Sequence, residues 1–356
     1  EYTHGNFVAQ VESLRRTYAI EPGEVDLPTF PLFALFDPAL GMSAIIPEMD
    51  PTRPADVDPT KILAAIRRYD VTNMFGSPAL LHRVGAYGAE QDTALPTLRR
   101  VVSAGAPVQA AVIERFASML PDRAEVHTPY GATESLPVAT IGSDEILGET
   151  AAETAVGRGV CVGRPVETMD VRVIAIDDDA IPTWRDDLEV PEGTVGEIVV
   201  KGPVATRRYF GRDEATRLAK IQDPGGGFWH RMGDVGYRDE RGRIWFCGRK
   251  VHRVALRDGS TLFPVMCEGV CNTQPDVYRT ALVGVDGTPI LCVERHPGRG
   301  RDTRQLEAEL RELGARHAGT RGIDVFLWHD DFPVDIRHNA KIFREKLATR
   351  AADQRR

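Results

Sequence analysis

Segments with helical and strand-like patterns alternate over residues 1–140, and this alternation limits the fold more than any other feature. Residues 58–70 (DPTKILAAIRRYD) have helical spacing, and residues 71–78 (VTNMFGSP) have the apolar content and closing turn of a short buried strand. A strand at 98–108 (LRRVVSAGAPV) likewise precedes a helix at 108–121 (VQAAVIERFASMLP). The apolar stripes of the two helices are Ile62, Ala65, Ile66 and Tyr69, then Val112, Ile113, Phe116 and Leu120. This order favours an α/β fold in layers.

The pattern changes near residue 155. Short strands separated by Gly, Pro and Asp come next (VRVIAID, TVGEIVVKG and RIWFCGR), and they indicate a small antiparallel β subdomain. Beyond Gly248-Arg249-Lys250 the chain has two further strands and an amphipathic helix, TRQLEAELRELGARH, which indicates a small α+β module. For 356 residues we therefore expect an α/β part at 1–155, a β-rich subdomain at 156–248 and a small C-terminal domain at 249–356.

Composition favours a soluble globular protein in a reducing compartment. The net charge of -8 argues against a nucleic-acid partner, which needs a basic face. Five cysteines, an odd number set among apolar neighbours, predict buried thiols and a cytoplasmic location. The start of the sequence has no signal-peptide pattern, and the most apolar stretch, 30–47, is broken by Asp37 and prolines, so we expect no transmembrane segment.

Two segments in the first half could contact a ligand. In SAGAPV (103–108) the small residues would let a ligand ring lie against the backbone; the alternative is a plain strand-to-helix turn. In HTPYGATES (127–135), just after an apparent strand, a Tyr can stack on a base, a Thr can bind a phosphate oxygen and a Glu can hold a hard cation. The alternative for this segment is an ordinary polar turn.

Two segments in the second half are also candidates. In residues 228–250, Asp234 can take both hydroxyls of a ribose and Arg249 can brace the ribose or its phosphate; the alternative is a hairpin with surface charges. In FPVDIRHNAKIFREKL (332–347), Lys341 comes after a turn-like approach and is expected to open a helix. The alternative for Lys341 is a solvated helix face.

In this order and at these spacings the four segments resemble the adenylate-forming enzymes, a family that includes acyl-CoA synthetases, luciferases and peptide-synthetase adenylation domains. SAGAPV is similar to the adenine-contacting loop of that family, YGATE to its Tyr-Gly-x-Thr-Glu signature, RMGDVGY to its ribose-binding Gly-Asp and VDIRHNAKIFR to the motif of its mobile catalytic lysine. The resemblance covers nearly the whole chain. It implies a layered α/β N-terminal domain with a small β subdomain and a mobile, small α+β C-terminal domain.

The resemblance implies a role for each matching residue. Gly105, Ala106, Pro107, Tyr130 and Gly131 would border the adenine of ATP. Thr133 would contact the α-phosphate, Glu134 would ligate Mg²⁺, and Asp234 and Arg249 would hold the ribose. Lys341 would bridge the carboxylate and the α-phosphate, where negative charge develops as the acyl-adenylate forms. With Thr133 and Glu134, it completes the expected catalytic set.

The sequence departs from the family in four places. The phosphate loop ending in Lys-Gly is absent, and EYTHGNF resembles the segment directly after that loop, so we expect a part of a longer protein that adenylates poorly alone. After Gly248-Arg249 the chain has Lys250, Val251 and His252 in place of the usual acidic hinge, and Gly259-Ser260-Thr261 lacks the usual Arg. Ala34 stands at a position where relatives have His. The adenylation residues are kept, whereas the thioester-forming features are altered.

This contrast, with the strings HTPYGATES and RHNAKI, resembles the β-lactone synthetases of olefin biosynthesis. That resemblance implies ATP-dependent adenylation of a β-hydroxy acid, whose own hydroxyl then displaces AMP and closes a β-lactone, with diphosphate as the other product. The apolar residues Phe30, Phe33, Leu35, Phe36, Met42 and Ile45 either line a channel for alkyl chains or belong to the core.

Two alternatives remain open at this point: a fatty acyl-CoA or acyl-carrier ligase, and a non-catalytic acyl or nucleotide binder. The expected ligands are ATP, Mg²⁺ and a small β-hydroxy acid, and assembly with other olefin-pathway enzymes is a further possibility. The base that takes the proton from the β-hydroxyl is not identified; the spacing of His127 and His252 supports neither.

Overall fold

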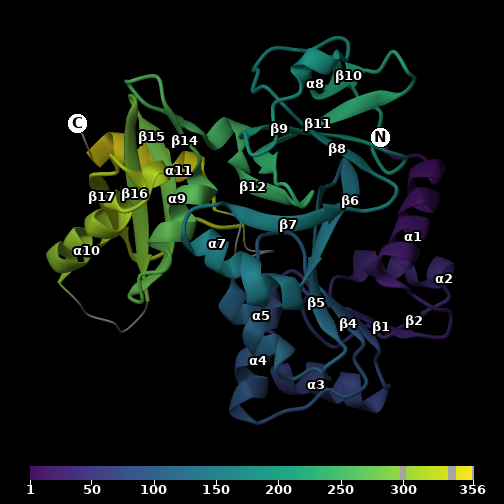
Figure 1. The fold of residues 1–356 in the computed structure, drawn as a ribbon. Helices are drawn as coiled ribbons and strands as arrows, with labels where there is room; N and C mark the ends of the chain where they lie inside the picture. The colour runs from purple at the N-terminus through teal and green to yellow at the C-terminus, as the bar shows by residue number, and fades with distance from the viewer. Residues whose placement is uncertain (297–301, 336–341, 355–356) are drawn as a thin grey trace.

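The structure, a computed structural model, describes residues 1–296, 302–335 and 342–354 (Figure 1). A twelve-stranded sheet runs through the larger part, in the order β2-β1-β3-β4-β5-β6-β7-β12-β11-β9-β8, with β10 paired to β11. The strands of its first half pair in parallel; they are β2 (Ser43–Ala44), β1 (Val25–Pro28), β3 (Asn73–Phe75), β4 (Arg100–Val102) and β5 (Glu125–Ala132).

Helices cover both faces of this parallel half. Figure 1 shows α3 (Pro59–Arg68), α4 (Pro78–Glu90) and α5 (Ala110–Ala117) on one side, and α1 (His4–Tyr18) and α2 (Asp37–Leu40) on the other. Successive side chains of a strand point to opposite faces, so in β4 Val101 joins the core beneath α3–α5, whereas Val102 packs with the cluster of α1 and α2. The predicted α/β layering is therefore confirmed.

The second half of the sheet is antiparallel. Its strands are β6 (Ser135–Gly142), β7 (Val160–Pro165), β8 (Asp170–Ile174), β9 (Gly196–Lys201), β10 (Lys220–Gln222), β11 (Phe228–Arg238) and β12 (Ile244–Arg249). Short helical segments interrupt it; they are α6 (Ser143–Glu145), η3 (Ile146–Thr150), α7 (Ala151–Ala155) and α8 (Asp213–Ala219). The strands expected after residue 155 form, but β6 and β7 are hydrogen-bonded, so the ladder continues from the parallel half without a break.

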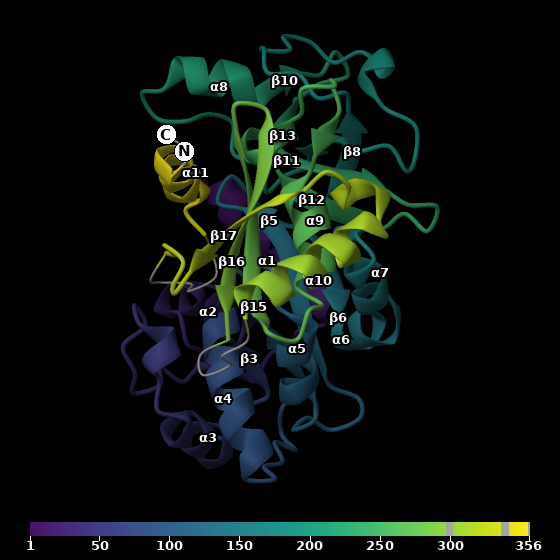
Figure 2. The ribbon, with the colours of Figure 1, turned by 90° about the vertical axis from the view of Figure 1, so that its left-hand side faces the viewer.

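The C-terminal part has its own small sheet, which Figure 2 shows in front of the large sheet. It contains β15 (Val277–Val285), β16 (Thr288–Arg295) and β17 (Val325–His329), with the pair β13 (Val254–Ala255) and β14 (Thr261–Leu262) nearby. Its helices are α9 (Pro264–Cys271), α10 (Thr303–Ala315) and α11 (Arg344–Gln354). The predicted small α+β unit is confirmed as a fold, whereas the boundaries given above for the three parts stay predictions.

Two local expectations were wrong, and a third lies outside the described residues. Tyr69 is exposed and not part of an apolar stripe, because α3 ends at Arg68 and Tyr69 is its C-cap. The Tyr-Gly of HTPYGATES lies within β5 and not after it. The helix expected to open at Lys341 concerns a residue that lies outside the described residues; α11 begins at Arg344.

All five cysteines are free and buried, as predicted, and burial raises the pKa of the Cys161 thiol to about 11 and that of Cys247 to about 12. Within the three described ranges, no helix has the length and apolar content needed to cross a membrane.

Candidate active site

The carboxyl ends of the parallel strands β3, β4 and β5 meet at one edge of the sheet, where α/β proteins bind ligands. After β4 the chain forms the loop that contains Gly105, Ala106 and Pro107 before α5 begins. The amide of Ser103 donates to the carbonyl of His127 at 2.9 Å, which ties the start of this loop to β5. Gly105 has φ +101° and is exposed, so its backbone is open to a ligand.

A tight hairpin between β5 and β6 carries the rest of the HTPYGATES motif. Thr133 and Glu134 form its tip, with Ala132 opposite Ser135. Gly131 is required here, since a Cβ at this position would lie 2.6 Å from the carbonyl oxygen of Ser135. The Glu134 carboxylate accepts from the Tyr209 hydroxyl at 2.9 Å, and its backbone carbonyl accepts from the amide of Thr206 at 2.8 Å. The tip is therefore anchored from outside the hairpin.

Asp234 is hydrogen-bonded to both Tyr130, an expected adenine contact, and Arg249, an expected ribose contact. Its Oδ2 accepts from the Tyr130 hydroxyl at 2.7 Å, and its Oδ1 accepts from Nη1 of Arg249 at 2.9 Å. Asp234 on β11 is the register partner of Arg249 on β12, so the sheet itself places the carboxylate beside the guanidinium. Asp234 is buried while the Arg249 side chain is half exposed, which leaves the cation accessible from solvent.

The electrostatics of this cluster are governed by burial. Burial raises the pKa of Asp234 above its ordinary value, and Arg249 and the Tyr130 hydroxyl oppose that rise. Burial and the Asp234 charge raise the pKa of Tyr130 well above its ordinary value, so its hydroxyl stays a donor. A carboxylate has about four acceptor positions, so Asp234 can accept two ribose hydroxyls besides its two present donors.

A second set of polar groups lies behind Glu134. Lys220 is buried, and its ammonium donates to the carbonyl of Thr206. Burial lowers the pKa of Lys220 to about 8, and burial with the Lys220 charge lowers the pKa of His230 to about 4. His230 is therefore neutral near pH 7, and Lys220 is the cation that faces Glu134.

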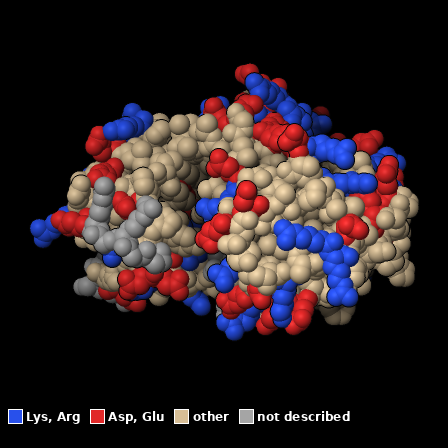
Figure 3. Space-filling model, turned by 90° about the horizontal axis from the view of Figure 1, so that it is seen from below, with Lys and Arg blue, Asp and Glu red and all other residues tan. Residues whose placement is uncertain are grey.

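The Glu134 carboxylate has the chemistry that a magnesium ion requires of its ligands. Glu134 is the one predicted metal ligand, and the described residues contain no cluster of three or more His, Cys, Asp or Glu side chains that could hold a metal ion. Mg²⁺ usually takes one or two carboxylates and completes its shell with phosphates and water, so a single carboxylate at a hairpin tip fits that chemistry. The surface of the protein has a hollow near the middle of the face seen in Figure 3, between the C-terminal part and the large part.

The structure brings Tyr130, Asp234 and Arg249 together and places Thr133 and Glu134 at the tip of the hairpin that carries Tyr130. Lys341 lies outside the described residues. Tyr209, Lys220 and His230 were missed by sequence reasoning. Tyr209 and Glu134 are 75 residues apart, and a lone Tyr in a polar loop has no periodic pattern that would indicate such a contact.

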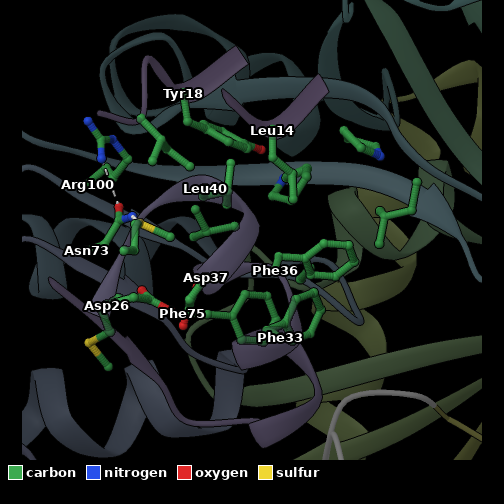
Figure 4. A pocket seen from close by; sticks show the side chains of 18 residues that line it. Leu14, Tyr18, Asp26, Phe33, Phe36, Asp37, Leu40, Asn73, Phe75 and Arg100 are labelled. Carbon is green, nitrogen blue, oxygen red and sulfur yellow. Dashed lines mark hydrogen bonds between the residues drawn. The ribbon is translucent and has the colours of Figure 1, made fainter. Parts of the chain in front are cut away.

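An apolar cavity of about 80 Å³ lies beside this edge (Figure 4). Ala104 and Pro129 line it from the loop after β4 and from β5, and Phe33, Phe36 and Met42 line it from the apolar stretch at 30–47. Of the other residues expected in an acyl channel, Phe30 and Leu35 are exposed and Ile45 packs against the main core. Three of the six thus face this cavity, and three do not.

The sequence is similar to those of two curated proteins. The chain is 52% identical to the olefin β-lactone synthetase of Xanthomonas campestris and 49% identical to that of Stenotrophomonas maltophilia; each match covers 99% of this chain and 64% of the relative. The chain therefore spans about two thirds of the length of these relatives.

Solved structures share the fold. An amide bond synthetase from Marinactinospora thermotolerans superposes with a TM-score of 0.78 at 24% identity, over 97% of this chain and 66% of that one. The o-succinylbenzoate coenzyme A synthetase of Bacillus subtilis, in complex with ATP and a magnesium ion, has a TM-score of 0.75 at 22% identity, over 97% and 66%. The family model described as AMP-binding enzyme matches residues 1–210, so this chain belongs to the AMP-binding enzyme family.

Proposed function

We propose that the protein activates a β-hydroxy carboxylic acid with ATP and closes it to a β-lactone, releasing AMP and diphosphate. The observation that carries this proposal is the 52% identity to an olefin β-lactone synthetase over 99% of the chain. It is supported by the Tyr130–Asp234–Arg249 cluster, which supplies the acceptor and cation that a ribose and its phosphate need. ATP and Mg²⁺ are the proposed ligands.

In this proposal the loop after β4, strand β5 and the Asp234–Arg249 pair bind the adenine and the ribose. Gly105, Ala106 and Pro107 offer backbone groups to the adenine, and Tyr130 and Gly131 border it from β5. Asp234 accepts from the ribose hydroxyls, and the half-exposed Arg249 braces the ribose and the phosphate.

The groups at the hairpin tip act on the phosphates. The exposed Thr133 hydroxyl donates to the α-phosphate, and Glu134 ligates Mg²⁺, which neutralises phosphate charge when bound. Tyr209 and the amide of Thr206 hold Glu134 in place, so the carboxylate need not reorganise as the ligand arrives. Lys341 is proposed to bridge the carboxylate and the α-phosphate; this role rests on the resemblance of its motif.

Ring closure needs no second substrate. A hydroxyl on the β-carbon is held beside the activated carbonyl by the substrate itself, so no second molecule has to be bound and oriented. The departures at Lys250–His252 and Gly259–Thr261 agree with a site that does not use coenzyme A.

The test is a product assay with the full-length protein, ATP, Mg²⁺ and a 3-hydroxy fatty acid. We expect β-lactone and AMP in equal amounts without coenzyme A, and Lys341→Ala should reduce AMP formation about 100-fold or more. A thioester that forms only after coenzyme A is added, with no lactone, would identify the acyl-CoA ligase instead. Tight nucleotide binding without AMP release would indicate a non-catalytic binder.

A further inference from the structure

The apolar cavity beside the active-site edge contains two buried carboxyl groups, Asp26 from β1 and Asp37 from the start of α2. Both are at most 6% exposed, and Figure 4 shows them on the same side of the cavity, near Phe75. Apart from Asp26, Asp37, Asn73 and Arg100, nearly all of the lining is apolar. Carboxyl groups in such surroundings are costly to bury unless something pairs with them.

Arg100, a cation in the lining of the cavity, is paired with an acid other than Asp26 and Asp37. Arg100 donates through Nη1 to Glu24 at 2.5 Å and to Asn73 at 3.2 Å, and through Nη2 to the carbonyl of Ala19 at 3.3 Å. These contacts use its charge to balance the buried Glu24. Arg100 is therefore no partner for Asp37.

Asp37 has one carboxylate oxygen without a hydrogen-bond partner in the part of the chain that the structure describes. Its Oδ2 is buried and has no hydrogen-bond donor among the described residues, whereas buried polar atoms are almost always satisfied. Asp37 is the first residue of the four-residue helix α2, whose N-cap, Phe36, makes no side-chain cap hydrogen bond. Since Asp37 lines the cavity, a ligand there that donates a hydrogen bond would supply the partner that this carboxyl group lacks.

The ionisation of the two acids is compatible with this role. Burial raises the pKa of Asp37 to about 6, and burial with the Asp37 charge raises the pKa of Asp26 to about 8. Near pH 7 Asp37 is then mostly ionised while Asp26 is mostly protonated. A carboxylate with a pKa close to the working pH is an effective proton acceptor.

The cavity lies where the acid portion of a substrate would meet the nucleotide. Ala104 precedes Gly105 in the loop after β4, Pro129 precedes Tyr130, and Leu136 and Pro137 come shortly after the Glu134 hairpin tip. A volume of about 80 Å³ accommodates a few heavy atoms, such as the carbons around a β-hydroxyl, and not a long chain.

We propose that Asp37 accepts the hydrogen bond of the substrate β-hydroxyl in this cavity and takes its proton as the lactone closes. This inference rests on the proposed function. The O–H bond breaks, and its proton passes to the Asp37 carboxylate. The hydroxyl oxygen bonds to the activated carbonyl carbon, and the bond from that carbon to the phosphate oxygen breaks, with its electron pair leaving on AMP. Asp37 then returns the proton to solvent.

The test separates adenylation from ring closure in the full-length protein. In a single turnover, Asp37→Asn, nearly isosteric, should release diphosphate from ATP with both a 3-hydroxy fatty acid and the same acid without the hydroxyl, at a rate within about threefold of wild type. Lactone formation should fall about 100-fold or more, the usual effect of losing a general base, and hydroxylamine should trap the accumulated adenylate. Asp37→Glu, which restores a carboxylate, should recover part of the lactone rate.

The controls distinguish the possible failures. Asp56→Asn, an exposed acid outside the cavity, should change neither step. Lactone at the wild-type rate from Asp37→Asn, or Asp37→Glu no better than Asp37→Asn, would overturn the role of Asp37. Equal loss of both steps with a lowered melting temperature would assign Asp37 a structural role and also overturn it. If wild type makes adenylate and no lactone, the proposed function fails instead.

Discussion

At the scale of single residues, Asp234 is held by a neutral donor and a charged one. The Tyr130 hydroxyl approaches one carboxylate oxygen from β5 and the Arg249 guanidinium approaches the other from β12. Tyr130 is buried in a cluster with Val138, Ala139 and Met232, so its ring is fixed by packing independently of its hydroxyl. Removing only the hydroxyl therefore tests the hydrogen bond without disturbing the packing.

Tyr130→Phe should lower the free energy of unfolding by about 1.5–3 kcal/mol, because the bond to the charged Asp234 is already made without ATP. It should also raise the KM for ATP, because the Asp234 carboxylate is no longer held by Tyr130. The loss of a donor also raises the pKa of Asp234, so the acid limb of the pH profile of kcat/KM should move to higher pH. Urea unfolding measures the first effect, and diphosphate release at several pH values measures the other two.

Tyr237→Phe is the matched control for this prediction, since the Tyr237 hydroxyl donates to the carbonyl of Arg158, away from Asp234. It should leave the KM for ATP and the acid limb in place. A KM unchanged in Tyr130→Phe would mean that the Tyr130–Asp234 bond does not organise the nucleotide site.

At the scale of elements, Lys250 connects the turn after β12 to β9 and to the segment after β8. Its ammonium donates to the carbonyl of Asp177 at 2.7 Å and lies 3.2 Å from the buried Glu197 of β9. Glu197 also accepts from Arg231 at 2.6 Å. Lys250 thus balances part of the charge of a buried carboxylate, whereas Val251 and His252 stand where the family's two acids would be.

Lys250→Met should lower the free energy of unfolding by about 1–3 kcal/mol, since a buried carboxylate loses one of its two cations and the carbonyl of Asp177 loses a donor. The control is Arg217→Ala in α8, whose partner Glu214 is as exposed as Arg217 itself; it should cost less than about 1 kcal/mol. Urea unfolding measures both, and equal effects in the two variants would contradict the prediction.

The elements were predictable where the local pattern decides the structure. The strands around Val101, Val199 and Leu291 are short apolar runs bounded by turn residues, and all three form. Tyr69 was misassigned because helical spacing alone does not locate the C-cap. Part of the apolar wall of the Asp37 cavity was among the alternatives that the sequence left open, whereas its two acids could not be predicted, because the cavity needs β1, α2, β5 and β6 packed together and no local pattern encodes that contact.

At the scale of the whole molecule, α9 packs against both sheets: it contacts β12 and α7 of the large part and β15 of the C-terminal part. Gly269 permits the approach to α7, since a Cβ there would lie 2.5 Å from the carbonyl oxygen of Thr154. Glu268, next to it, accepts two bonds from Arg344 of α11, at 2.5 and 2.8 Å. One short helix therefore connects the two parts.

Gly269→Ala should force α9 and α7 apart and lower the free energy of unfolding by about 1–3 kcal/mol, as overpacking does. It should also speed limited proteolysis between the two parts. Gly148→Ala in η3 is the control, because its Cβ would meet no atom within 4 Å. Similar stability of the two variants would contradict a close α7–α9 contact.

The continuous sheet has a consequence for dividing the protein. The pairs Ala139–Pro165 and Thr140–Arg164 join β6 to β7 across the boundary predicted at residues 155 and 156. Fragments expressed on either side of that boundary would each have an exposed edge strand with unpaired amides and carbonyls. Such an edge is a template for aggregation. The two regions should refold only when both are present, so complementation of separated fragments, rather than independent folding, is the behaviour to expect of residues 1–248.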